Sequence, residues 1–137
     1  MTVIVDASVA IKWVMVEDGS DAANSLVTAE NLAAPELLFA ECANVLWTKV
    51  RRGHLSPQLA KHALTVIDSI PIRAVPIRQH FAAALAIALE LDRSAYDSLY
   101  LAVALAERAT LITADVKFAA AAQAHPTFGS SVRLLTP

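Results

Sequence analysis

The chain has 137 residues, a formal net charge of −2 and a hydrophobic fraction of 56%. This length is typical of a single domain, and a composition so rich in apolar residues excludes a disordered chain. The slight excess of acid argues against a protein that holds nucleic acid on a broad basic face, because neutralising phosphates requires many lysines and arginines.

The sequence also lacks the signs of several other protein classes. Its single cysteine, Cys42, excludes a disulfide framework and a zinc site built from cysteines. No apolar run approaches the ~20 residues that span a bilayer, and the first residues do not resemble a signal peptide. The three glycines are too far apart for a glycine-rich phosphate loop, and the four histidines are scattered. We therefore expect a cytoplasmic protein without membrane contact, whose chemistry depends on carboxylates.

Short strands and longer helices are predicted to alternate along the chain. In chain order the apolar pattern predicts a strand at 3–5, helices at 8–16 and 20–30, a weak strand at 32–34, helices at 36–52 and 57–69, a strand at 72–75, helices at 78–91 and 95–108, a strand at 110–113, a helix at 116–124 and a last strand at 132–135.

Local signals mark several of these boundaries. The helix that begins near residue 20 has Asp18 or Ser20 as its candidate cap. Gly53 is expected to end helix 36–52, and Ser56 followed by Pro57 is typical of a helix start. Pro35 is expected to stop the second strand.

The alternation of strands and helices predicts an α/β fold. Its centre is expected to be a mainly parallel five-stranded sheet with helices on both faces, because strands buried on both faces read as continuous apolar runs. In such sheets ligands bind beyond the carboxyl ends of the strands, where the strand order reverses.

Four carboxylates are placed where this fold builds a site. Asp6 ends the first strand and Asp115 follows the strand at 110–113, while Asp97 lies in the first turn of an apolar helix. Glu41 lies inside an apolar helix with no basic residue three or four positions away. Several acids without histidine or cysteine suit a hard cation such as Mg²⁺ or Mn²⁺.

Each acid also has a structural interpretation. Asp6 and Asp115 are placed to cap the helices that follow them, and Ser94-x-x-Asp97 has the spacing of a capping box. Glu41 is alternatively an exposed residue between two apolar stripes. Capping and metal binding are compatible, because a helix N-terminus keeps a carboxylate ionised.

Four segments that contain these acids resemble, in order, the motifs of the PIN-domain ribonuclease family, and specifically its VapC-like toxins from bacterial type II toxin–antitoxin pairs. They are Val3-Ile4-Val5-Asp6-Ala7-Ser8, the stretch from Pro35 to Leu46, the stretch from Tyr96 to Ala102, and the stretch from Thr113 to Phe118. The resemblance covers residues 1–137, as a single PIN-like domain.

The resemblance implies a site and a reaction. Asp6, Glu41, Asp97 and Asp115 would hold one or two Mg²⁺ or Mn²⁺ ions that activate water to cleave an RNA phosphodiester. The supporting polar residues would be Ser8, Asn44 and Thr113; for each, a local hydrogen bond to the backbone is the alternative.

The resemblance also implies partners: an RNA substrate, a second copy in a homodimer, and an antitoxin whose tail crosses the groove of the site. Trp13, Met15 and Trp47 would line that groove, or else pack in the core. Candidate contacts to the RNA backbone are Lys12, Lys49, Arg51, Arg52, Arg93 and Lys117. Arg51 and Arg52 have an alternative role at the negative end of a helix dipole.

Two other functions remain open at this point. One is a non-catalytic PIN-like binding module, in which the acids only cap helices. The other is a receiver-like signalling domain, which would need a second acid beside Asp6 and a lysine after a late strand; no lysine follows Lys117. The net charge does not exclude an RNA substrate, because setting aside the four proposed ligands leaves 11 − 9 = +2 for the rest of the chain.

Overall fold

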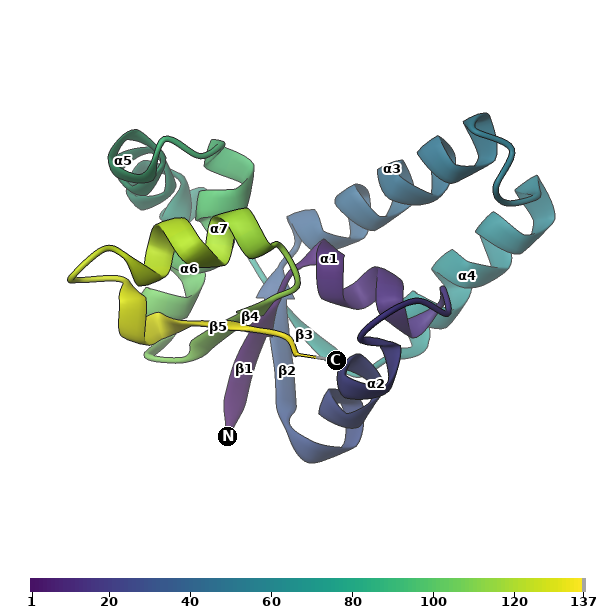
Figure 1. Ribbon diagram of the computed structural model, residues 1–137, viewed down its shortest axis with the longest axis horizontal. Helices are drawn as coiled ribbons and strands as arrows, with labels where there is room; N and C mark the ends of the chain where they lie inside the picture. Colours follow the sequence, from purple (N-terminus) through teal and green to yellow (C-terminus); the bar gives the residue numbers. More distant parts are fainter. Residues whose placement is uncertain (137) are drawn as a thin grey trace.

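A five-stranded sheet forms the centre of the computed structural model, which describes residues 1–136 (Figure 1). The strand order is β3–β2–β1–β4–β5, and every neighbouring pair is parallel. The predicted α/β class is therefore confirmed, and the sheet is wholly parallel. The strands are β1 (Thr2–Val5), β2 (Asn31–Pro35), β3 (Ile72–Val75), β4 (Thr110–Thr113) and β5 (Val132–Leu134).

Helices cover both faces of the sheet. Figure 1 shows α1 to α4 on one face and α5 to α7 on the other. This division follows from right-handed crossovers, because β1, β2 and β3 step one way across the sheet and β4 and β5 step the other. The strand order thus reverses between β1 and β4. The helices are α1 (Ala7–Ala10), α2 (Ser20–Ala29), α3 (Leu37–Arg51), α4 (Pro57–Ser69), α5 (Phe81–Leu91), α6 (Ala95–Glu107) and α7 (Val116–Gln123), with short 3₁₀ turns η1 (Ile11–Trp13), η2 (Arg78–His80) and η3 (Gly129–Ser131).

The core is built from the central strands and one buried helix. Ile4 and Val5 of β1 and Leu111 and Ile112 of β4 are fully buried. Every residue of α6 from Ser98 to Ala104 is buried as well, so this helix is a central element of one layer. Among the described residues, no helix combines the length and apolar character needed to cross a membrane.

The predicted helix at 8–16 is wrong in extent. The α-helix stops at Ala10 and the 3₁₀ turn stops at Trp13, after which the chain turns away and exposes Val16. The Ser20 hydroxyl fixes this turn, since it donates to the carbonyl of Met15 and accepts the N–H of Glu17. These bonds satisfy backbone groups that a longer helix would otherwise pair.

Two further boundaries differ from the prediction. Gly19 caps α2 in place of Asp18 or Ser20, because its φ of 89° gives a left-handed conformation that glycine adopts freely. Pro35 belongs to β2, where it pairs with Val75 at the end of the strand, beyond the register that β2 shares with β1. The other signals hold: the Ser56 hydroxyl accepts the N–H of Leu59 at the start of α4.

Candidate active site

Asp6 lies at the carboxyl end of β1, at the point where the strand order reverses. Its Oδ1 accepts the Val9 N–H (3.2 Å) as the cap of α1, and it also accepts the Ser8 hydroxyl (2.5 Å). Its Oδ2 accepts the Thr113 hydroxyl (2.5 Å) from the end of β4. Asp6 therefore has the capping role that the sequence predicts and lies at the switch point of the sheet as well.

The turn after β4 brings Asp115 to the same place. Its Oδ1 accepts the Phe118 N–H (3.0 Å) and so caps α7. The Thr113 hydroxyl accepts the N–H of Asp115 (3.1 Å), and the Ser8 hydroxyl accepts the N–H of Ala114 (2.9 Å). Ser8 and Thr113 thus contact the Asp6 carboxylate and also fasten this turn to the end of β1.

The other two acids come from helices. The Ser94 hydroxyl accepts the N–H of Asp97 (3.1 Å) and starts α6, which places Asp97 in the first turn. Glu41 is half-buried on α3, and its Oε1 accepts the Tyr100 hydroxyl (2.5 Å) from α6. The partner of the mid-helix glutamate is therefore a tyrosine from another element.

These four acids line one cavity of about 420 Å³. Its walls come from the ends of β1 and β4 and from α1, α3 and α6, so residues far apart in the sequence meet there. The lining residues are Asp6, Ala7, Ser8, Ile11, Lys12, Glu17, Glu41, Val45, Lys49, Asp97, Tyr100, Ala114 and Asp115.

The electrostatics of the cavity reflect crowding of negative charge. Burial raises the pKa of Asp6 from 3.8 to about 6; hydrogen bonds from Ser8, Thr113 and the Val9 N–H oppose this shift, and the charge of Asp97 adds to it. Burial also raises the pKa of Glu41, with Tyr100 opposing and Asp97 adding to the shift. The pKa of Asp97 rises through burial and the charge of Asp115.

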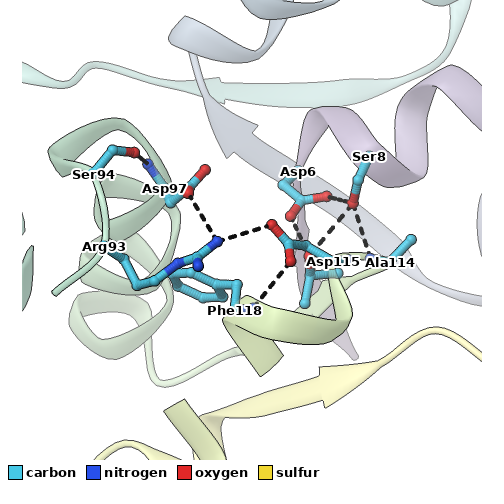
Figure 2. A network of polar contacts seen from close by, with 9 residues as sticks. Asp6, Ser8, Arg93, Ser94, Asp97, Ala114, Asp115 and Phe118 are labelled. Atoms are coloured by element: carbon cyan, nitrogen blue, oxygen red, sulfur yellow. Dashed lines mark hydrogen bonds and ion pairs between the residues drawn. The ribbon is translucent and has the colours of Figure 1, made fainter. Parts of the chain in front are cut away.

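One cation lies among these acids. Figure 2 shows the guanidinium of Arg93 in contact with Asp97 and Asp115. Arg93 Nη2 lies 3.3 Å from Asp115 Oδ2 and 3.8 Å from Asp97 Oδ2. Its charge holds the pKa of Asp97 down against the effects that raise it. The sequence predicts Arg93 as an RNA contact, whereas its side chain forms ion pairs with two of the acids.

The other predicted basic residues are spread over the surface. Lys12 lines the cavity, but its ammonium is bound by Glu17 (3.2 Å) and by the carbonyl of Asp18 (2.7 Å). Lys49 lines the cavity too. Arg51, Arg52 and Lys117 are exposed and do not line it.

One predicted polar residue and two unpredicted ones also lie at or beside the cavity. Asn44 is exposed and lines a neighbouring hollow together with Glu41. The sequence reasoning missed Tyr100 and Glu17. A tyrosine three residues after Asp97, on the same helix face, is the signal for Tyr100. Glu17 offers no such signal, because it lies in the short stretch between the predicted helices at 8–16 and 20–30.

The donor set of the cavity fits a hard divalent cation. It supplies carboxylate oxygens without sulfur or imidazole, and the position between Asp97 and Asp115 already accommodates a positive charge. Within residues 1–136, no group of three or more His, Cys, Asp or Glu side chains is arranged closely enough to hold a metal ion as it stands. The acids would have to turn toward one another to share an ion.

The model of the family described as PIN domain matches residues 3–124. This chain belongs to the PIN-domain family. The ribonuclease VapC9 of Mycobacterium tuberculosis is 32% identical over 123 residues, which is 90% of this chain and 93% of that protein. The PIN domain described here is therefore a homologue of the VapC ribonucleases, and the receiver-like alternative is excluded.

Solved structures share the fold of this PIN domain. PAE2754 from Pyrobaculum aerophilum superimposes with a TM-score of 0.72 at 24% identity, covering 88% of this chain and 79% of its own. A toxin–antitoxin complex from Klebsiella pneumoniae superimposes with a TM-score of 0.58 at 20% identity, covering 84% of this chain and 88% of the matched chain.

Proposed function

We propose that this PIN domain is a metal-dependent endoribonuclease and the toxin of a type II toxin–antitoxin pair, acting in the cytoplasm. The observation that carries the proposal is the meeting of four carboxylates in one cavity at the switch point of the sheet. The similarity to a VapC ribonuclease supports the reaction class.

In this proposal Asp6, Glu41, Asp97 and Asp115 hold one or two Mg²⁺ or Mn²⁺ ions. When bound, such an ion supplies an activated water and stabilises the negative charge of a phosphodiester under attack. The protein's own part is to hold the acids. Ser8 and Thr113 orient Asp6 from two sides, and the Tyr100 hydroxyl orients Glu41. Burial keeps the pKa of Tyr100 above its ordinary value, so its hydroxyl remains a donor.

The RNA substrate is proposed to reach the cavity beside Lys49. Two lysines line the cavity. Lys12 forms an ion pair with Glu17, whereas no ion pair of Lys49 is found in residues 1–136. Arg51, Arg52 and Lys117 lie outside the lining and are assigned at most peripheral contacts to the phosphate chain.

Trp13, Met15 and Trp47, predicted to line the groove of the site, do not line the cavity of the acids. The antitoxin is therefore proposed to dock on the two apolar hollows beside them, which flank α4. One, of about 400 Å³, lies against the turn that contains Trp13 and Met15; the other, of about 270 Å³, lies between α3 and α4 beside Trp47. The Trp47 side chain is 55% exposed, although large aromatic side chains are usually buried. The toxin–antitoxin complex among the structural neighbours supports this occupant.

A second copy of the chain is proposed to pack on α5. Phe81, Leu85 and Leu89 are 65%, 55% and 76% exposed and follow one another at one-turn spacing. Arg78 and Asp92 lie seven residues to either side of Leu85 and are exposed. A two-fold axis at Leu85 would therefore place Arg78 of each copy beside Asp92 of the other, which makes the face self-complementary.

The substitution Asp97→Asn tests the proposed reaction, with Asp21→Asn as its matched control. Both changes remove one negative charge from the first turn of a helix, but only Asp97 lines the cavity. We expect Asp97→Asn to lower Mn²⁺-dependent cleavage of total RNA by about 100-fold or more, since even indirect supports of a metal site are worth 10–100-fold.

The measurement is sequencing of RNA ends after incubation with Mn²⁺, together with growth of cells that express each variant. Asp21→Asn should cleave RNA and inhibit growth like the parent, and co-expression of the proposed antitoxin should relieve that inhibition. Undiminished cleavage by Asp97→Asn would overturn the proposed function and favour a non-catalytic PIN-like module.

A further inference from the structure

Arg93 is held in place by the turn between α5 and α6. Asp92 adopts a left-handed conformation with a φ of 53°, and the Arg93 N–H donates to the carbonyl of Ala88 (3.3 Å). The guanidinium lies over the ring of Phe118, with its central carbon 6.0 Å from the ring centroid. The side chain is 26% exposed, so its charge lies beside the two acids and is largely withdrawn from bulk water.

The guanidinium contacts two acids but leaves one of its own donors without a hydrogen bond among the described residues. Nη2 reaches Asp97 in the same segment and Asp115 after β4, whereas the buried Nε has no partner within residues 1–136. An unpaired buried donor costs free energy. The guanidinium is attracted to both carboxylates, and its positive charge reduces the repulsion between them; this accounts for its placement.

The oxygen that faces Arg93 is also the one that a metal would need. Asp115 Oδ1 already accepts the Phe118 N–H, which leaves Oδ2 as its free oxygen. That same Oδ2 accepts from Arg93 at 3.3 Å. A divalent cation that binds Asp115 Oδ2 would therefore meet the positive charge of Arg93 on the same oxygen (Figure 2).

We propose that Arg93 is an internal counterion that competes with the divalent cation for Asp97 and Asp115, so that metal binding displaces the guanidinium from this pair. The inference rests on the proposed metal site. It makes Arg93 a positioning residue that neutralises the two acids until the ion arrives. The released guanidinium remains close to the cavity, near the ring of Phe118.

Calorimetric titration of Mn²⁺ at pH 8, where carboxylates are ionised, tests the competition. We expect Arg93→Gln to bind Mn²⁺ about tenfold more tightly than the parent, because the ion no longer displaces a cation. Arg93→Lys, which retains the charge, should stay within about threefold of the parent. The control is Arg133→Gln, since Arg133 is exposed on β5 and has no ion pair in the described part of the chain; it should leave Mn²⁺ affinity unchanged.

Equal or weaker Mn²⁺ binding by Arg93→Gln would overturn the inference while leaving the proposed function intact, provided that Asp97→Asn loses Mn²⁺ binding. Mn²⁺ binding that survives Asp97→Asn would instead overturn the proposed site. A second measurement needs no variant: the Arg93 Nε–H resonance of the parent protein should shift when Mg²⁺ saturates the site. A resonance that stays in place at saturation would contradict displacement.

Discussion

At the scale of single residues, Asp6 combines a structural role with a chemical one. The three groups that hydrogen-bond its carboxylate favour the ionised form, yet burial outweighs them and raises its pKa to about 6. A cap needs only one of its oxygens, and the second is held by Thr113 from another strand. The residue is therefore more constrained than capping requires, and its charge costs stability in the metal-free protein.

This cost predicts that Asp6→Asn stabilises the metal-free protein at neutral pH. Asp6 has a pKa of 3.8 when unfolded and about 6 when folded, so the folded state holds its proton more tightly. The stability from that proton is complete below pH 4 and is lost as pH rises through 6, by up to about 3 kcal/mol. Asparagine keeps the cap but has no charge to lose.

The measurement is urea unfolding in EDTA at several pH values. The advantage of Asp6→Asn over the parent should grow between about pH 4 and pH 7 and then level off. Asp21→Asn, which changes an exposed acid, should track the parent throughout. An advantage that does not change with pH would contradict the raised pKa, and activity should be lost in Asp6→Asn in any case.

The sequence predicted where the acids lie but not what surrounds them. Asp6 and Asp115 follow strands, so the sheet topology alone brings them together. The contact of Tyr100 with Glu41 joins residues 59 positions apart, and the packing of two helices decides it. The ion pair of Arg93 with Asp115 depends in the same way on how α6 and α7 meet. Such contacts leave no periodic signal in a single sequence.

At the scale of elements, the sequence predicted the order and type of strands and helices, because continuous apolar runs and helical periodicity are local. It misjudged residues 14–16, where a serine hydroxyl turns the chain out of a helical course. It also left open which side of α5 faces inward. This helix is apolar nearly all round, and the structure buries Ala84 and Ile87 while Phe81, Leu85 and Leu89 point outward.

The outward face of α5 predicts that Leu85→Glu dissociates a homodimer. The two copies of Leu85 would meet at the axis, so the substitution places two like charges together in an apolar interface, which is costly. We expect the variant to be monomeric at concentrations where the parent is dimeric, with a dissociation constant at least about 100-fold higher. Sedimentation velocity over a dilution series provides the measurement.

Leu59→Glu on α4 is the control for this experiment. Leu59 is 57% exposed, nearly the same as Leu85, but lies on the opposite layer of the molecule. It should leave the parent's association state unchanged. If Leu59→Glu dissociates the dimer and Leu85→Glu does not, the interface lies on α4 and the assignment to α5 is wrong.

At the scale of the whole molecule, the distribution of charge matters more than the net charge of −2. Five of the 13 acids line one cavity: the four proposed ligands and Glu17, which pairs with Lys12. Arg93 is already committed to two of the four proposed ligands. Of the other basic residues, Lys12 and Lys49 line the cavity, whereas Arg51 lies against the ring of Trp47 outside it. Because Lys12 is paired with Glu17, Lys49 is the one cation without an ion pair that the described residues place in the cavity lining.

This charge distribution predicts that RNA binding depends on the metal and only weakly on salt. A divalent ion in the cavity would turn the most negative part of the surface into an attractive one, so EDTA should weaken binding of a fluorescent oligoribonucleotide by at least about tenfold. With about two phosphates neutralised, one by Lys49 and one by a peripheral basic residue, the logarithm of affinity should fall with the logarithm of salt at a slope near −1.4. Anisotropy titrations on ice in Mg²⁺ and in EDTA, with gels showing that the RNA stays intact, measure both quantities. Affinity unaffected by EDTA, or a slope near −4, would mean that RNA is held by a basic face and not through the metal site.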